Sequence, residues 1–111
     1  MQIEQLKQRI DRIEECADQA KQACQKGSPP PELRECVVSL HQQASGAKHT
    51  AQGQSATEDG LRQDVVQLES TADRAMQACR NAGNVDPQLK QAVERTHAEA
   101  SSLKKELMQA A

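Results

Sequence analysis

Residues 3–24 read IEQLKQRIDRIEECADQAKQAC and carry the clearest pattern in the chain. The apolar residues of this stretch follow one another at alternating intervals of three and four: Ile3, Leu6, Ile10, Ile13, Ala17, Ala20 and Cys24. Side chains at this spacing share one face of an α-helix, and the spacing is typical of helices that pack side by side. Gln, Glu, Lys and Arg fill most other positions and favour helix. We therefore predict a long amphipathic helix here.

The same spacing recurs in three more segments, at residues 33–51, 61–79 and 89–107. No segment alternates between apolar and polar residues over a useful length, so we predict no strands. Gly27 and Gly83 stand where a left-handed cap ends a helix, and Pro31 and Pro87 suit the first turn of the next one. Asp86 can cap the fourth helix. The sequence thus predicts four helices and no sheet.

The second half of the chain resembles the first half. Residues 6–26 align with residues 61–81, and after a one-residue insertion residues 27–48 align with residues 83–104. Of these 43 aligned positions 17 are identical. Apolar spacing alone does not explain the shared polar and special residues: Glu14/Glu69, Asp18/Asp73, Gln22/Gln77, Cys24/Cys79 and His41/His97. We predict a tandem duplication of one helical hairpin.

Two hairpins with short connections favour an antiparallel up-down-up-down four-helix bundle, an all-α fold. We predict one domain over residues 1–111, with hairpin 1 at about 2–52, a linker at about 53–55 and hairpin 2 at about 56–110. Ser55 and Glu58 have the spacing of a capping box that opens the third helix. The pattern also fits two elongated hairpins that complete their core by dimerising, so a monomer and a homodimer both stay open.

Composition excludes several classes of function. The net charge is −2, and the chain contains no Trp, Tyr or Phe, so we predict no nucleic-acid binding. No apolar run approaches the roughly 20 residues of a membrane span, and residues 1–4 lack a secretory pattern. We expect a cytoplasmic protein with four reduced cysteines and no membrane contact.

The two aligned histidines are the first candidates for chemistry. His41 and His97 fall beside the core stripe, and the helix register brings Glu14 near His41 and Glu69 near His97. The simplest interpretation is two half-exposed Glu–His pairs. A di-iron site needs two Glu-x-x-His motifs, but only Glu94 and His97 form one. A histidine phosphotransfer role is a weaker alternative, because neither histidine has the expected basic residue three positions later.

The cysteines supply the other alternative. Cys24 and Cys79 occupy aligned core positions, where Cys acts as a small apolar residue. The chain has no C-x-x-C motif. A metal-binding or thiol-redox sensing bundle could still use weak candidates from both aligned pairs: Cys24, Cys79, His41 and His97. We predict no catalytic or cofactor-binding residues and no bound cofactor.

These patterns favour a non-enzymatic helical interaction or structural module. Three apolar residues stand outside the core stripe and align with polar or charged residues in the other half: Val38, Val66 and Met76. Such residues are candidates for contact with a protein partner or with a second copy of the chain. The sequence therefore predicts protein–protein interaction and does not name the partner.

Overall fold

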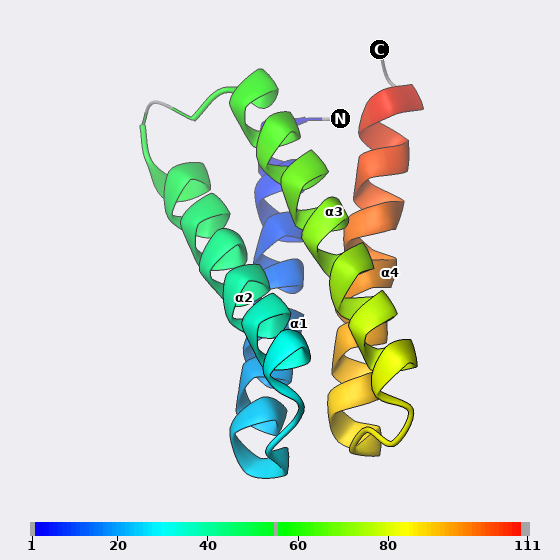
Figure 1. Ribbon diagram of the computed structural model, residues 1–111. Helices are drawn as coiled ribbons and strands as arrows, with labels where there is room; N and C mark the ends of the chain where they lie inside the picture. Colours follow the sequence, from blue (N-terminus) through cyan, green and yellow to red (C-terminus); the bar gives the residue numbers. More distant parts are fainter. Residues whose placement is uncertain (1, 55, 110–111) are drawn as a thin grey trace.

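The computed structural model describes residues 2–54 and 56–109, and in this part of the chain the backbone forms four α-helices and no strand. Figure 1 shows α1 (Ile3–Gly27), α2 (Pro31–Gln52), α3 (Glu58–Ala82) and α4 (Pro87–Gln109). The predicted all-α class and the four predicted helices are confirmed.

The helices form a bundle in which each one packs along two neighbours. α1 lies against α2 and α4, and α3 lies against the same two helices, whereas α1 and α3 face each other across the diagonal with few contacts. The α1–α2 and α3–α4 connections lie at one end of the bundle, and the α2–α3 connection and both chain ends lie at the other (Figure 1). The seams between neighbouring helices are therefore the places where side chains from different segments meet.

The predicted apolar stripes fill the core. All of their residues are buried except Ile3, which is half-buried. Each core cluster contains both large and small side chains. Leu6 and Ala51 belong to one cluster, and Leu33 and Ala20 belong to the other. A fully buried leucine contributes about 1.5–3 kcal/mol of transfer free energy, and alanines allow the helices to approach closely. Few large apolar residues therefore suffice to build the two core clusters.

Among the described residues two polar side chains, those of Thr71 and Thr96, are buried with these apolar ones, and both are hydrogen-bonded. The Thr96 hydroxyl donates to the backbone oxygen of Ala92, one helical turn earlier, over 2.7 Å. The Thr71 hydroxyl donates to Gln43 Oε1 over 2.8 Å. Because a buried hydroxyl without a partner costs free energy, these bonds make threonine acceptable at both positions.

The connections confirm most of the predicted helix ends and correct one. α2 begins at Pro31 and α4 begins at Pro87, as the missing proline N–H allows. Gly83 ends α3 with a positive φ of 75°. Gly27, in contrast, is the last helical residue of α1, and the left-handed residue is Ser28, with a φ of 48°. The predicted cap at Gly27 was therefore wrong by one residue, and a serine rather than a glycine adopts the left-handed conformation.

The start of α3 also differs from the prediction. Ser55, predicted to cap this helix together with Glu58, lies outside the described residues. The helix begins at Glu58, and Thr57 is the capping residue, since its hydroxyl accepts a hydrogen bond from the backbone N–H of Gly60 over 3.1 Å. A threonine two positions later thus takes the capping role.

Beyond the buried stripes most surface positions are polar, with Val38 and Met108 as the exposed large apolar residues of the described part of the chain. Asp86 accepts a hydrogen bond from the backbone N–H of Gln88 over 2.8 Å, which confirms its predicted role at the start of α4. Along the described residues no helix combines the length and the apolar character that crossing a membrane requires. The features that distinguish one part of this surface from another lie at the seams.

Candidate functional sites at the helix seams

A compact polar group lies at the seam between α1 and α2, which we call the first seam. His41 Nε2 on α2 is 3.3 Å from Asp18 Oδ1 and 3.8 Å from Glu14 Oε2, both on α1. One potential ligand atom from each of the three residues lies within 4.8 Å of the other two. Glu14 and Asp18 are four residues apart, so they share one face of α1. The side chains of Glu14 and His41 are only 17% and 18% exposed, and that of Asp18 is 44% exposed.

Two further side chains orient the carboxylates of the first seam. Lys48 Nζ donates to Glu14 Oε1 over 3.4 Å, and Gln22 Nε2 donates to Asp18 Oδ2 over 2.9 Å. Each carboxylate therefore has one oxygen held by a neighbour, while its other oxygen faces His41 Nε2. The result is three potential metal-ligand atoms, one nitrogen and two oxygens, close together between the two helices.

The seam between α3 and α4, the second seam, carries the same five residue types at the aligned positions. His97 Nε2 is 3.6 Å from Asp73 Oδ1, and Lys104 Nζ donates to Glu69 Oε1 over 3.2 Å. Gln77 Nε2 donates to Asp73 Oδ2 over 3.5 Å, a longer bond than its counterpart at the first seam. Among the described residues, Asp73 is the only acidic partner within ion-pair distance of His97. The second seam thus repeats the His–Asp, Lys–Glu and Gln–Asp contacts of the first, but its His, Asp and Glu do not form a group of three close ligand atoms.

A serine accounts for part of this difference. Ser101 Oγ lies 3.4 Å from His97 Nε2, the same ring nitrogen that faces Asp73. Ser45 occupies the aligned position at the first seam, and the hydrogen bonds of the described chain include none between Ser45 and His41. His41 Nε2 therefore faces the carboxylates alone.

The sequence predicted part of this arrangement. The expected proximity of Glu14 and His41 is present, whereas Glu69, expected beside His97, lies outside ion-pair distance of it. The roles of Asp18 and Lys48 were missed. The signal was available, because both are identical in the two aligned halves and neither belongs to the core stripe.

The cysteines lie apart from the histidines. Cys24 and Cys79 belong to the core cluster nearer the α1–α2 and α3–α4 connections, and both are buried. Burial raises the pKa of both thiols, which favours the unreactive protonated form at neutral pH. In residues 2–54 and 56–109 the only three-residue group of close His, Cys, Asp or Glu donors is Glu14, Asp18 and His41. The structure therefore does not bring the four weak metal candidates together.

The three predicted partner-binding residues line three separate grooves. Met76 lines a groove of about 480 Å³ near the α3–α4 connection. Apolar Met76, Cys79 and Val85 form part of its wall, and the other lining residues are polar or small: Arg80, Gly83, Asn84, Lys90 and Glu94. Grooves that bind helices combine apolar and charged lining residues in this way.

A smaller groove of about 220 Å³ occupies the corresponding place near the α1–α2 connection. Val38, 39% exposed, lines it together with Lys21, Cys24, Gln25 and Arg34. Each of these five residues aligns with a residue of the Met76 groove. The two grooves differ in which helix carries the large apolar residue. In the Val38 groove it lies on α2, at the position aligned with Glu94, and in the Met76 groove it lies on α3, at the position aligned with Lys21 of α1.

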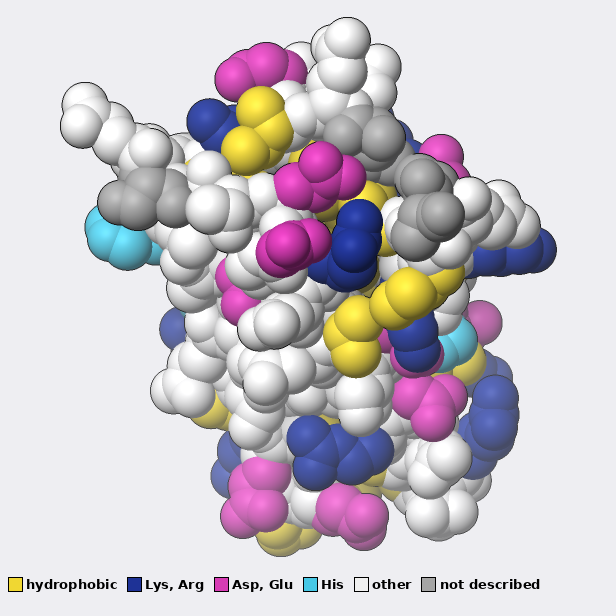
Figure 2. All heavy atoms as spheres, turned by 90° about the horizontal axis from the view of Figure 1, so that it is seen from above, with side chains coloured by type: hydrophobic (Ala, Val, Ile, Leu, Met, Phe, Trp, Pro, Cys, Tyr) yellow, Lys and Arg dark blue, Asp and Glu magenta, His cyan; other side chains and the backbone are white. Residues whose placement is uncertain are grey.

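Val66 belongs to a third groove, of about 390 Å³, between α3 and α4 toward the chain ends. Its other apolar residue is Met108, which is 50% exposed. The sequence comparison missed Met108 because the aligned segment ends at residue 104. Figure 2 views the bundle from this end and shows hydrophobic side chains in small groups, separated by charged and polar ones. This end therefore offers small apolar anchors rather than one broad apolar patch.

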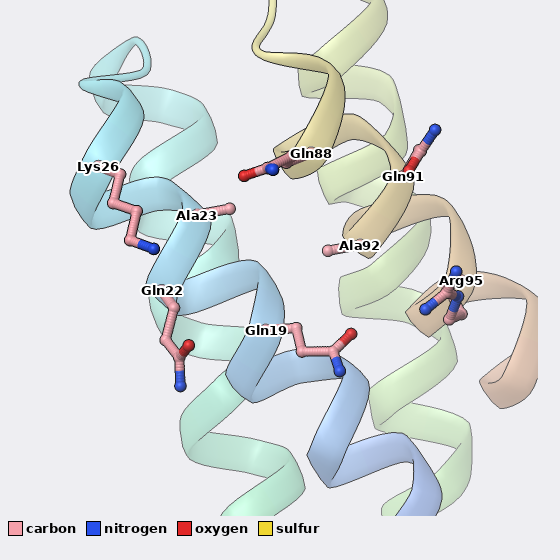
Figure 3. A pocket seen from close by; sticks show the side chains of 8 residues that line it. All are labelled: Gln19, Gln22, Ala23, Lys26, Gln88, Gln91, Ala92 and Arg95. Atoms are coloured by element: carbon pink, nitrogen blue, oxygen red, sulfur yellow. The ribbon is translucent and has the colours of Figure 1, made fainter.

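A fourth groove, of about 210 Å³, lies between α1 and α4 (Figure 3). Ala23 and Ala92 point toward each other across it, and their small side chains leave the space open. The rest of its lining is amide and cationic: Gln19, Gln22, Lys26, Gln88, Gln91 and Arg95. Such a lining can hydrogen-bond polar groups, and it has no pair of groups for acid–base catalysis.

Comparison of the chain with protein-family models, with curated proteins and with solved structures finds no match.

Proposed function

We propose that this chain is a non-enzymatic helical interaction module that binds an acidic amphipathic helix of a protein partner. The observation that carries the proposal is the Met76 groove. Met76 and Val85 are both half-buried there, so their apolar surfaces remain available to a partner side chain. Arg80 and Lys90 stand at the same groove and are both exposed.

The charge of the two related grooves indicates the kind of partner. The Val38 groove includes Lys21 and Arg34 and no acidic residue, and the Met76 groove includes two basic residues and one acidic residue. Both linings are thus net positive in a chain whose net charge is −2. A partner helix with an apolar anchor and flanking Asp or Glu residues complements both grooves.

The same proposal includes the origin of the bundle. We infer an antiparallel up-down-up-down arrangement that arose by tandem duplication of one hairpin. The identities at exposed polar positions and the position of the connections in Figure 1 support this inference. A duplicated hairpin presents the same seam and groove twice, and later substitutions such as Lys21 against Met76 can then specialise one copy. The four free cysteines fit a reducing compartment such as the cytoplasm.

The histidine phosphotransfer alternative has less support. His41 Nε2 faces Glu14 and Asp18, whose negative charges oppose the approach of a phosphoryl group. The thiol-redox alternative requires reactive thiolates, and burial raises the pKa of all four thiols. The binding proposal therefore remains the function that the geometry supports best.

The test is a display selection of helical peptides against the purified 111-residue chain, followed by titration of the enriched peptides. We expect enrichment of acidic amphipathic peptides that lose at least tenfold in affinity for the Met76→Glu variant. Val66→Glu is the matched control, because Val66 lies on the same helix with a similar exposure but lines another groove. Enriched peptides that bind both variants equally, or a selection without acidic amphipathic peptides, would contradict the proposal.

A further inference from the structure

We propose that the first seam binds one divalent transition-metal ion of the zinc class, through His41 Nε2, Asp18 Oδ1 and Glu14 Oε2. This site is independent of the docking grooves, because none of its three residues lines the Met76 or Val38 groove. It also differs from the thiol–histidine site that the sequence left open, since its ligands are one imidazole and two carboxylates.

The distances suit a common metal ion. Ligand atoms bonded to zinc at about 2.1 Å lie about 3.4 Å from one another in a tetrahedral site. Here the separation of His41 Nε2 from Asp18 Oδ1 is 3.3 Å and that from Glu14 Oε2 is 3.8 Å. One potential ligand atom from each of the three residues lies within 4.8 Å of the other two. Both separations from His41 Nε2 are therefore close to the tetrahedral value.

The donor atoms select the class of ion. One imidazole nitrogen with two carboxylate oxygens suits zinc and its first-row neighbours, whereas Ca²⁺ and Mg²⁺ prefer sites built from oxygen alone. Asp18 is 44% exposed, so water can reach the ion from that side and fill the remaining coordination positions. With three protein ligands and an open side, the site binds more weakly than a four-ligand structural zinc site.

The surrounding residues do what the outer shell of a metal site does. Lys48 and Gln22 each hold the outer oxygen of one carboxylate and leave the inner oxygen directed at His41. Partners of this kind fix the orientation of metal ligands. The two carboxylates also outweigh the single charge of Lys48, so the group attracts a cation.

The second seam is an internal control for the same chemistry. It carries the same five residue types, but the charged partner of His97 is Asp73, and Ser101 shares His97 Nε2. Glu69 is bonded to Lys104 as Glu14 is to Lys48, but among the described residues it makes no ion-pair contact with His97. We therefore expect the first seam to bind the ion at least tenfold more tightly than the second.

The experiment is a Zn²⁺ titration of the 111-residue chain, kept reduced with a non-chelating phosphine. Calorimetry gives the stoichiometry and affinity, and the imidazole proton signals of His41, His49 and His97 in NMR spectra identify the ligand. A parallel Co²⁺ titration separates the thiols from this site, because thiolate ligands add an intense near-ultraviolet band that nitrogen and oxygen ligands do not. We expect one tight equivalent that moves the His41 signal first and produces no thiolate band.

The variants decide whether this group is the site. His41→Ala and Asp18→Asn should each weaken Zn²⁺ binding at least tenfold, and the aligned changes His97→Ala and Asp73→Asn should leave the tight equivalent intact. All four changes fall on half-buried or exposed residues, and circular dichroism without metal checks that each variant folds. Unchanged Zn²⁺ affinity in His41→Ala or Asp18→Asn, or a thiolate band in the Co²⁺ complex, overturns the proposal.

Discussion

The first and second seams hold the same five polar residue types, and they differ in what surrounds the histidine. At the first seam two carboxylates face His41 Nε2, whereas at the second seam Asp73 and the hydroxyl of Ser101 face His97 Nε2. The difference shows that identical residues at aligned positions do not guarantee the same site. The positions of the neighbouring side chains decide which partners meet.

The cores of the two helix pairs differ at an aligned position too. Leu40 of α2 aligns with Thr96 of α4, and both are fully buried. Leucine contributes apolar contact alone, whereas threonine fills less space and satisfies its hydroxyl within its own helix. The first helix pair therefore depends more on side-chain packing at this level of the bundle.

The largest change in stability that we predict tests this difference in packing. Leu40→Ala removes a fully buried side chain and should lower the free energy of unfolding by about 2–5 kcal/mol. Thr96→Ala removes a methyl-sized group and one hydrogen bond, for which we expect a loss of about 1 kcal/mol. Equilibrium urea unfolding of both variants measures the difference. Equal losses would mean that the two helix pairs pack equally tightly at this level.

The next prediction concerns the lysine at each seam and its effect on Zn²⁺ affinity. Replacing Lys48 by Met removes a positive charge that holds Glu14, and at low salt it should tighten Zn²⁺ binding by about tenfold. Lys104→Met at the second seam should leave the tight equivalent unchanged. Calorimetric titration at two salt concentrations checks both, and the gain should shrink as salt is added. A weaker affinity in Lys48→Met would show that orienting Glu14 matters more than the charge of the lysine.

The sequence predicted the helices and their buried faces because both depend on local spacing. Every stripe residue from Leu6 onward is buried, and the prolines stand where helices begin. The cap at Gly27 failed because a serine next to it adopts the left-handed conformation, which the preference for glycine does not anticipate. Local pattern thus determines where a helix exists more firmly than where it ends.

Local spacing predicted only part of the candidate site. Helix register brings Glu14 near His41, but the choice between Glu14 and Asp18 as its closer partner depends on side-chain rotamers in three dimensions. The same holds for Ser101, which contacts His97 whereas its counterpart Ser45 has no such bond to His41 in the described chain. Met108 was missed for a different reason, since it has no aligned counterpart in the first half.

A smaller effect concerns the cysteines, whose surroundings differ between the helices. Burial raises the pKa of all four thiols, so alkylation at pH 7 should be slow and should accelerate as the pH rises. Cys36 is half-buried and the other three are buried, so Cys36 should react first. Timed labelling with iodoacetamide and peptide mass spectrometry gives the order. Earlier labelling of Cys79 would indicate that the Met76 groove opens in solution.

The smallest change in stability that we predict concerns Asp64 of α3, which aligns with Arg9 of α1. Arg9 forms an ion pair with Glu106 of α4, whereas burial raises the pKa of Asp64 and disfavours its charged form. A raised folded-state pKa makes Asp64 destabilising at neutral pH, and this penalty disappears as the pH falls below the ordinary value of 3.8.

Asp64→Asn should therefore raise the free energy of unfolding at pH 7 by up to about 0.5 kcal/mol. The advantage of the variant should vanish near pH 3, where Asp64 is protonated in both the folded and the unfolded chain. Urea unfolding of the variant and the parent chain at the two pH values measures this difference. An advantage of the same size at both values would assign the effect to the amide itself, because the ionisation of Asp64 contributes only at the higher pH.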